Sequence, residues 1–249
     1  PSYSLQKETK HVSKRKQLRN GLESSDDLGN FGALSLISCS NKSTITLDNC
    51  TFDENKAARK CGAVHLLLEK ESAIVSIVEC NFTGNVAVYD TGALYFEANA
   101  NSSPESSTLM VIENSTFHRN FARTDYGALY LSANDLQMKI SVVKCNFTSN
   151  IIRKITKDEQ DNQTTYNCGA LYIERVGPSS SILIHNSKFS GNKAEGDCGA
   201  VFIQSNYKSS KVTLTKTIVI LNEALKDFGG VFIETQGELN INECLFMNN

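Results

Sequence analysis

Apolar and polar residues alternate along most of the chain with a period of two, the pattern of β-strands that bury one face. The alternation falls into two kinds of block. In the first, apolar residues stand two and four positions after a glycine, as Val64 and Leu66 do. In the second, they stand seven and five positions before a phenylalanine, as Val75 and Ile77 do. The chain is therefore predicted to consist of short strands separated by turns, with no room for a helix.

Both blocks belong to a repeat that is marked by two short motifs. A Gly-Ala-apolar motif, Gly-Gly-Val in the last copy, begins at Gly32, Gly62, Gly92, Gly127, Gly169, Gly199 and Gly229. A Phe-x-x-Asn motif, with valine for phenylalanine in the sixth copy, ends at Asn55, Asn85, Asn120, Asn150, Asn192, Asn222 and Asn249. A fixed period of this length is typical of a solenoid in which each repeat forms one coil.

The position of the apolar residues changes parity between the fifth and the second residue before each phenylalanine, which requires a bend there. We therefore predict three short strands per repeat and an all-β fold, a right-handed parallel β-helix (solenoid) of about seven coils, over residues 30–249. The asparagines are predicted to form an internal ladder of amides between coils. Residues 1–29 lack the repeat and are predicted to form a separate N-terminal segment that caps one end. Polar insertions at 99–107 and 153–165 are expected to form flanking loops.

Composition limits the class of protein without naming a function. The net charge of −2 and the pI of about 6.1 give no global field that favours nucleic acid or an anionic membrane. No run of 18 apolar residues occurs, so we expect this segment not to insert into a bilayer. The chain opens on a basic, polar stretch without a signal peptide, and we interpret it as a mature or excised fragment.

Asn-x-Ser/Thr sequons predict N-glycosylation, and with it secretion by a eukaryotic cell. They begin at Asn41, Asn49, Asn81, Asn101, Asn114, Asn146 and Asn162. At Asn81 and Asn146 the next residue is a phenylalanine that should point inward, so the asparagine should point outward. Asn101 and Asn162 fall in the predicted loops.

The eight cysteines fit an oxidising compartment only in part. Cys168 and Cys198 occupy the same position in neighbouring coils, at a distance that a disulfide accepts, and we predict that they form one. Cys50 and Cys80 are also in register. For them a disulfide and a pair of buried thiols remain alternatives. No CxxC pair occurs, so no zinc site is predicted.

The third residue after each glycine is predicted to face outward, and it is aromatic in five coils. These residues are Tyr95, Tyr130, Tyr172, Phe202 and Phe232. They predict an exposed aromatic stripe that docks another protein, another copy of the chain, or the apolar faces of sugars. The alternative is that the rings only stabilise the sheet through contacts between strands.

Aspartates stand two residues before the glycine in four coils, at Asp90, Asp125, Asp197 and Asp227. Neighbouring pairs could hold calcium, and the alternative is that each residue caps a turn of the backbone. Asp90 and Asp125 are also the carboxylates that could serve a glycoside hydrolase. No cluster of basic residues accompanies them, and the histidines occupy unrelated repeat positions. We therefore predict no enzyme, no cofactor and no committed metal site.

The alternating Gly-Ala-apolar and Phe-x-x-Asn elements resemble the repeats of chlamydial polymorphic outer-membrane proteins, within the broader pectin-lyase-like β-helix superfamily. The resemblance covers residues 30–249. It implies a β-helix and, because those proteins are autotransported adhesins, binding rather than catalysis. The chain departs from their Gly-Gly-Ala pattern by carrying Cys, Thr, Tyr or Phe at the first glycine of nearly every copy.

Together these features predict an extracellular or cell-surface module, glycosylated and structural or adhesive. Its expected partners are other extracellular proteins or further copies of the β-helix, as in a larger filament or coat, and a glycan is a further candidate. Nucleic acid is not expected as a partner. The alternative function is a carbohydrate-active enzyme or carbohydrate-binding protein that acts on polysaccharide. The chain stops just after a Phe-x-x-Asn motif, which we interpret as leaving a coil edge for continuation or a partner.

Overall fold

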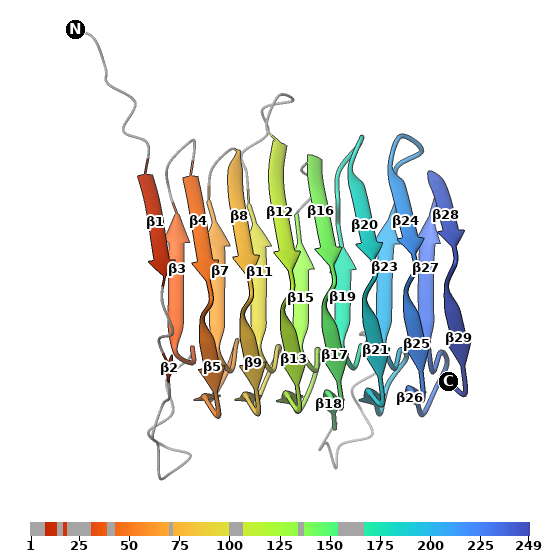
Figure 1. Cartoon of the computed structure of the whole chain (residues 1–249), viewed down its shortest axis with the longest axis horizontal. Coiled ribbons are helices and arrows are strands. Elements are labelled where there is room, and N and C mark those ends of the chain that lie inside the picture. Colours follow the sequence, from red (N-terminus) through yellow and green to blue (C-terminus); the bar gives the residue numbers. More distant parts are fainter. Residues whose placement is uncertain are drawn as a thin grey trace, which may run out of the picture.

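The chain winds into a right-handed parallel β-helix of about seven coils that lie side by side along the long axis of the molecule (Figure 1). The structure is a computed structural model. It describes residues 31–38, 43–69, 72–99, 107–133, 137–153 and 167–249, and the backbone of 8–13 and 17–18. Every pairing between named strands is parallel, and strands with the same place in successive coils form one sheet. The prediction of the fold class is confirmed.

Four sheets follow one another around each coil. Sheet 1 contains β3 (Leu34–Ser38), β7 (Val64–Leu68), β11 (Leu94–Ala98), β15 (Leu129–Ser132), β19 (Leu171–Glu174), β23 (Val201–Ser205) and β27 (Val231–Thr235). Sheet 2 contains β1 (Glu8–Ser13), β4 (Ser43–Asp48), β8 (Ala73–Val78), β12 (Ser107–Glu113), β16 (Gln137–Val143), β20 (Ser181–His185), β24 (Lys211–Thr215) and β28 (Glu238–Asn242).

The other two sheets are built from shorter strands. Sheet 3 contains β2 (Gln17–Leu18), β5 (Thr51–Asp53), β9 (Asn81–Thr83), β13 (Thr116–His118), β17 (Asn146–Thr148), β21 (Lys188–Ser190), β25 (Ile218–Ile220) and β29 (Leu245–Met247). Sheet 4 contains β6 (Lys56–Ala57), β10 (Val86–Ala87), β14 (Phe121–Ala122), β18 (Ile151–Ile152), β22 (Lys193–Ala194) and β26 (Glu223–Ala224).

The prediction of three strands per repeat was wrong, because each coil from β3 to β26 has four. The fourth is a two-residue strand of sheet 4 that directly follows the asparagine. Its second residue is buried, as Ala57 and Ala87 are. Two residues are too few to show an alternation of period two, so the pattern of the sequence could not reveal this strand.

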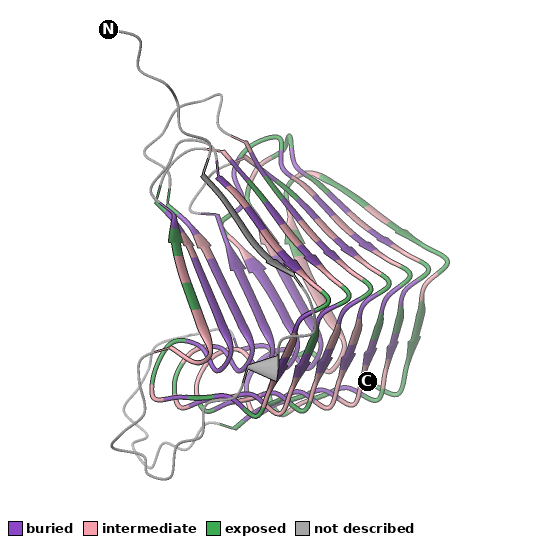
Figure 2. Cartoon of the chain, turned by 60° about the vertical axis from the view of Figure 1, so that its left-hand side comes forward, coloured by how far each residue is buried: buried purple, intermediate pink, exposed green. Residues whose placement is uncertain are grey.

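The predicted bend between sheets 2 and 3 is present in all seven coils. It is made by a residue with φ between 48° and 53°, at Asn49, Glu79, Asn114, Lys144, Asn186, Lys216 and Glu243. A single left-handed residue turns the chain and shifts the parity of the side chains. We call this row the 2/3 corner. All seven side chains are exposed, and Figure 2 shows the corner as the pointed edge of the stack.

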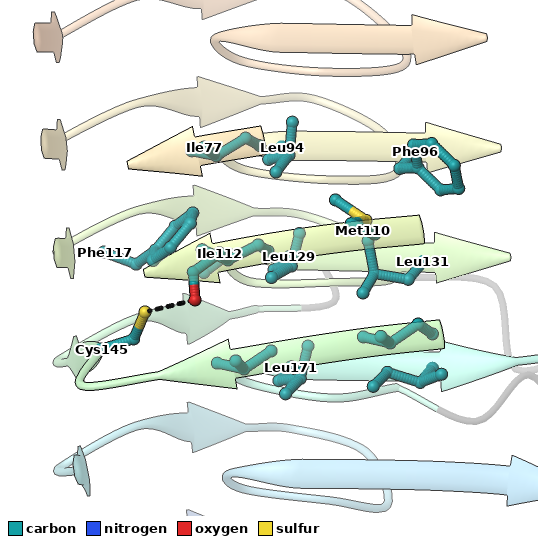
Figure 3. Close-up of a cluster of buried hydrophobic side chains, with 14 of the residues drawn as sticks. Ile77, Leu94, Phe96, Met110, Ile112, Phe117, Leu129, Leu131, Cys145 and Leu171 are labelled. Carbon is teal, nitrogen blue, oxygen red and sulfur yellow. Dashed lines mark hydrogen bonds between the residues drawn. The ribbon is translucent and has the colours of Figure 1, made fainter. Parts of the chain in front are cut away.

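The interior of the solenoid is one continuous apolar core. Phe52, Phe82, Phe117, Phe147 and Phe189 stack along sheet 3 with ring centroids 4.7–4.8 Å apart. Leucines of sheet 1 face isoleucines of sheet 2 across this core (Figure 3). The stacking distance equals the spacing of neighbouring strands, so each ring packs on its equivalent in the next coil.

The N-terminal segment adds strands to the solenoid, which the sequence did not predict. Residues 1–29 are predicted to lie outside the repeat, yet β1 pairs with β4 over six residues and β2 pairs with β5 over two. The segment therefore contributes the first strands of sheets 2 and 3, and Leu18 takes the register position of Phe52. The insertions predicted at 99–107 and 153–165 lie almost entirely outside the described residues. Across the described chain, no helix is long and apolar enough to cross a bilayer.

Candidate functional site

The asparagines that end each Phe-x-x-Asn motif form the predicted ladder through the whole stack. Asn120 is typical. Its Nδ2 donates to Oδ1 of Asn150 at 2.9 Å and to the carbonyl of Phe82 at 3.0 Å. Its Oδ1 accepts from Nδ2 of Asn85 at 2.9 Å and from the backbone N–H of Asn85 at 3.1 Å. The ladder satisfies backbone groups that would otherwise be buried unpaired, so these residues support the fold.

A second ladder of small polar side chains runs beside the 2/3 corner. Cysteine, serine or threonine directly follows the corner residue, at Cys50, Cys80, Ser115, Cys145, Ser187, Thr217 and Cys244. Each thiol or hydroxyl donates to the carbonyl two residues earlier, at 2.9–3.3 Å. Cys145 also donates to the carbonyl of Ile112 in the previous coil, at 3.4 Å (Figure 3). The sequence pattern predicts a core position here but does not indicate its hydrogen bond.

The predicted exposed aromatic stripe is wrong, because its rings are buried. Tyr95, Tyr130 and Tyr172 are 9, 7 and 3% exposed and Phe202 is 1% exposed, while Phe232 is partly buried. The rings do leave the main core on the outer face of sheet 1, as predicted. They then form a second apolar cluster there, with successive centroids 4.4–5.9 Å apart. No aromatic docking face remains at these five positions.

The rings are buried by the residues that stand just before each glycine. These residues form bridges between successive coils beside sheet 1, and Tyr126 packs on Tyr130 with ring centroids 4.5 Å apart. The tyrosine tips remain polar. Tyr95 Oη donates to Glu97 at 2.9 Å, and Tyr130 Oη donates to Glu174 at 2.7 Å. The outer face of sheet 1 is therefore a second core with a hydrogen-bonded rim.

The predicted disulfide between Cys168 and Cys198 is not formed, because both residues are buried thiols. For Cys50 and Cys80, where two alternatives were open, the structure has the pair of buried thiols. The side chains are in register as expected, but their thiols bond to the backbone. Cys168 Sγ donates to the carbonyls of Leu171 and Ala200, both at 3.2 Å. Burial raises the pKa of Cys168 well above its ordinary value. Such thiols are poor nucleophiles, which opposes oxidation.

The native protein is expected to react slowly with a thiol reagent such as a dithiobis-nitrobenzoate. Six of the seven described cysteines are buried, and burial raises the pKa of Cys61 and Cys145 to about 12. In guanidinium the same thiols should all react. A peptide map that recovered Cys168 and Cys198 joined by a disulfide would contradict the structure.

The four aspartates that the sequence offered as calcium candidates, without a committed metal site, lie in one row along the turns before sheet 1. The N–H of the following residue bonds to the carbonyl of the row residue one coil back, as from Tyr126 to Asp90 at 2.8 Å and from Phe228 to Asp197 at 2.7 Å. Asn167 separates the pair Asp90/Asp125 from the pair Asp197/Asp227.

The row does not assemble a calcium-type ligand set. Among the described residues, no group of three or more His, Cys, Asp or Glu side chains is arranged to hold a metal ion. The backbone N–H of Asp90 donates to Thr124 Oγ1 at 3.0 Å, and Thr124 donates to Asp125 at 2.9 Å. Asp197 caps a turn as the alternative expects, since its Oδ2 accepts from the N–H of Asn167 at 3.4 Å.

Burial raises the pKa of two aspartates of this row, Asp90 and Asp197. Burial, with the neighbouring Asp125 next in importance, raises the pKa of Asp90 to about 6, while Lys60 and Arg59 oppose the shift. Because the folded state holds this proton more tightly than the unfolded state, stability contributed by Asp90 falls as the pH rises from about 4 to about 6.

Asp90→Asn is expected to stabilise the protein at pH 7.5 by about 1 kcal/mol, after allowance for solvent screening. Asparagine tolerates the left-handed backbone of this position, where φ is 53°. Thermal unfolding at pH 7.5 and at pH 4 measures the difference, which should vanish at pH 4. The exposed substitution Glu79→Gln is the control and should change neither value. An equal gain for Asp90→Asn at both pH values would refute the assignment.

Asp90 and Asp125 are also the carboxylates considered for the alternative function of a glycoside hydrolase. Asp125 lies close enough to Asp90 to raise the pKa of Asp90. Glycoside hydrolases separate their two carboxyl groups by about 5 Å or more, so that the bond to be cleaved lies between them.

Four of the predicted glycosylation sites fall on described residues. Asn49 and Asn114 lie at the 2/3 corner and are exposed, and Asn81 is exposed at the start of β9. Asn146, at the start of β17, is half-buried, and its Oδ1 is buried without a hydrogen-bond partner. Asn41, Asn101 and Asn162 lie outside the described residues.

One groove was not predicted. It has a volume of about 350 Å³ and lies over sheet 4, where Phe121, Ile151 and Leu225 supply apolar surface. Ion pairs border it, from Arg153 to Glu195 at 3.3 Å and from Lys193 to Glu223 at 2.6 Å. Because the strands of sheet 4 have two residues each, no pattern in the sequence indicates this surface.

No protein-family model, curated protein or solved structure matches the chain. The assignment of the fold and of these surfaces therefore rests on the chain's own geometry.

Proposed function

We propose that the chain is an extracellular or cell-surface module with a structural or adhesive role. The observation that carries this proposal is the exposure of three sequon asparagines, Asn49, Asn81 and Asn114. The asparagines of the repeated Phe-x-x-Asn motifs, by contrast, bond to one another between coils and support the fold. A side chain that carries a glycan must reach solvent, and these three do. The resemblance of the repeat motifs to those of polymorphic outer-membrane proteins, which are adhesins, supports the same role.

The outer face of sheet 2 is the surface that we assign to protein contact. Its strands from β4 to β28 have five to seven residues, which makes a broad and flat face. Ile74 and Leu109 are paired neighbours on this face and are 49 and 36% exposed. Exposed apolar side chains grouped on a flat sheet are typical of a contact with another protein.

Binding to a polysaccharide is the second candidate function, and the groove over sheet 4 favours it. The groove combines an aromatic ring, Phe121, with charged groups at its border, Arg153 and Lys193 among them. A concave apolar floor with a few polar groups is the general form of a small-ligand site.

Two variants of the chain separate the two candidates. Antibody or protease access on intact source cells first establishes whether the native protein lies outside the cell. Ile74→Asp with Leu109→Asp should abolish adhesion to protein-coated or cell surfaces, whereas Ile151→Asp in the groove should leave adhesion unchanged. The reverse result, with loss of binding to polysaccharide arrays in Ile151→Asp, would favour the second candidate. A native protein confined to the cell interior would rule out the proposed function.

A further inference from the structure

Four sequons lie in four consecutive coils along one edge of the stack. Successive phenylalanines of these coils are register partners, from Phe52 through Phe82 and Phe117 to Phe147. The sequon asparagines stand at or beside the 2/3 corner. Asn49 and Asn114 are corner residues, and Asn81 and Asn146 follow the corner of their own coils by two positions. The fold thus gathers them in one place.

The four asparagines differ in how far their side chains are exposed. Asn49 and Asn114 have φ of 50° and 49°, and the left-handed turn of the 2/3 corner leaves their side chains exposed. Asn81 is exposed as well, and its Oδ1 accepts a hydrogen bond from its own sequon threonine, Thr83, at 3.0 Å. Asn146 differs, because its amide oxygen is buried.

We propose that Asn49, Asn81 and Asn114 carry N-linked oligosaccharides, which form a glycan-bearing edge on the N-terminal half of the 2/3 corner. This inference rests on the extracellular placement proposed above. The donor class is a lipid-linked oligosaccharyl diphosphate. The bond from sugar C1 to the diphosphate breaks, a bond from C1 to the asparagine Nδ2 forms, the amide loses one proton, and the lipid diphosphate leaves.

The two halves of the corner then have different surfaces. Asn49 and Asn114 are two coils apart, roughly 10 Å, so glycans on them and on Asn81 would crowd against one another. Beyond them the corner is charged, with ion pairs from Lys144 to Glu113 and from Lys216 to Glu243. A protein partner would be excluded from the glycan-bearing half and restricted to the other faces.

Glycopeptide mass spectrometry of the chain made in a eukaryotic secretory host tests this inference. The chain is recovered from both medium and cells and treated with a peptide:N-glycosidase in heavy-oxygen water, which labels each occupied asparagine. Most molecules should be labelled at Asn49, Asn81 and Asn114. Thr51→Ala, Thr83→Ala and Thr116→Ala, at half-exposed positions of sheet 3, should each remove one site only.

A created sequon provides the matched positive control. Asn186 is an exposed corner residue with φ of 48°, and Lys188→Thr turns its sequence into a sequon. Occupancy at Asn186 in this variant is expected. A secreted, folded chain with Asn49, Asn81 and Asn114 unmodified, or modified at Asn146 alone, overturns the glycan-bearing edge and leaves the extracellular proposal standing. Labelling of the three sites in the host, with a native protein found inside its own cells, would instead refute the proposed function.

Discussion

Gly127→Ala is expected to destabilise the protein by about 3–5 kcal/mol, or to prevent it from folding. A Cβ atom at this position would overlap the carbonyl oxygen of Gly169 in the next coil and crowd the backbone nitrogen of Ile151 at 3.2 Å. Both obstacles are backbone atoms held by the hydrogen bonds of the stack, so neither can move aside cheaply. Urea unfolding followed by circular dichroism measures the loss.

Gly84→Ala is the matched control for this prediction. Gly84 has φ of +63°, and the nearest atom that a Cβ would meet there is the flexible Glu54 Cγ, at 3.5 Å. Only the left-handed backbone opposes alanine, at a cost of about 1 kcal/mol. Equal losses for the two variants would mean that close approach between coils is not what requires glycine at position 127.

Asn120→Ala is expected to cost about 4 kcal/mol, because it leaves buried groups of the neighbouring coil without partners. The N–H of Asn85 loses its acceptor and the carbonyl of Phe82 loses its donor. Asn120→Asp should be no milder, since an ionised carboxylate cannot donate to Phe82 or to Asn150. Unfolding free energies from urea titration test both changes.

Asn81→Ala is the control for the ladder. This asparagine lies one coil from Asn120 but is exposed at the start of β9, and its replacement should change stability by less than about 0.5 kcal/mol. A loss at Asn120 no larger than that at Asn81 would contradict the structural role assigned to the ladder.

Much of the fold could be predicted because each coil repeats the same two steric demands. Each repeat has a glycine where the backbone of the next coil approaches too closely for a Cβ atom. Each repeat also has an asparagine that pairs with its equivalents, and both residues recur seven times at fixed places. The period of two then fixed which side chains of sheets 1 and 2 point inward. The left-handed corner was predicted only as a bend, since its residues range from Asn49 to Lys216 and share no chemistry.

The aromatic residues show where pattern reasoning fails. Their outward direction from sheet 1 is correct, but direction does not equal exposure. The residue before the glycine returns beside the same face and covers it, as Tyr126 covers Tyr130. The sequence does indicate this cover, because the residue before the glycine is Cys, Thr, Tyr or Phe, whereas a solvent-facing turn would be expected to carry polar residues. The family resemblance presents these residues only as a departure from a Gly-Gly-Ala pattern, whereas in the structure they belong to a second core.

The cysteines show a different limit. Register places Cys168 beside Cys198 and is read correctly from the spacing, but register does not choose between a disulfide and two thiols. The available carbonyls of Leu171 and Ala200 decide it, and their positions depend on the turn of the backbone. The groove over sheet 4 depends in the same way on strands too short to leave a pattern.

Native-state hydrogen exchange tests the central claim most directly, which is that in-register ladders between coils, and not a surface site, account for the repeated motifs. The backbone amides of Asn85, Asn120 and Asn150 each donate to the next asparagine side chain at 3.0–3.1 Å inside the stack. They should exchange only through global unfolding, with protection equal to the full free energy of unfolding. Exchange of these three amides as fast as that of an unstructured peptide would contradict the account.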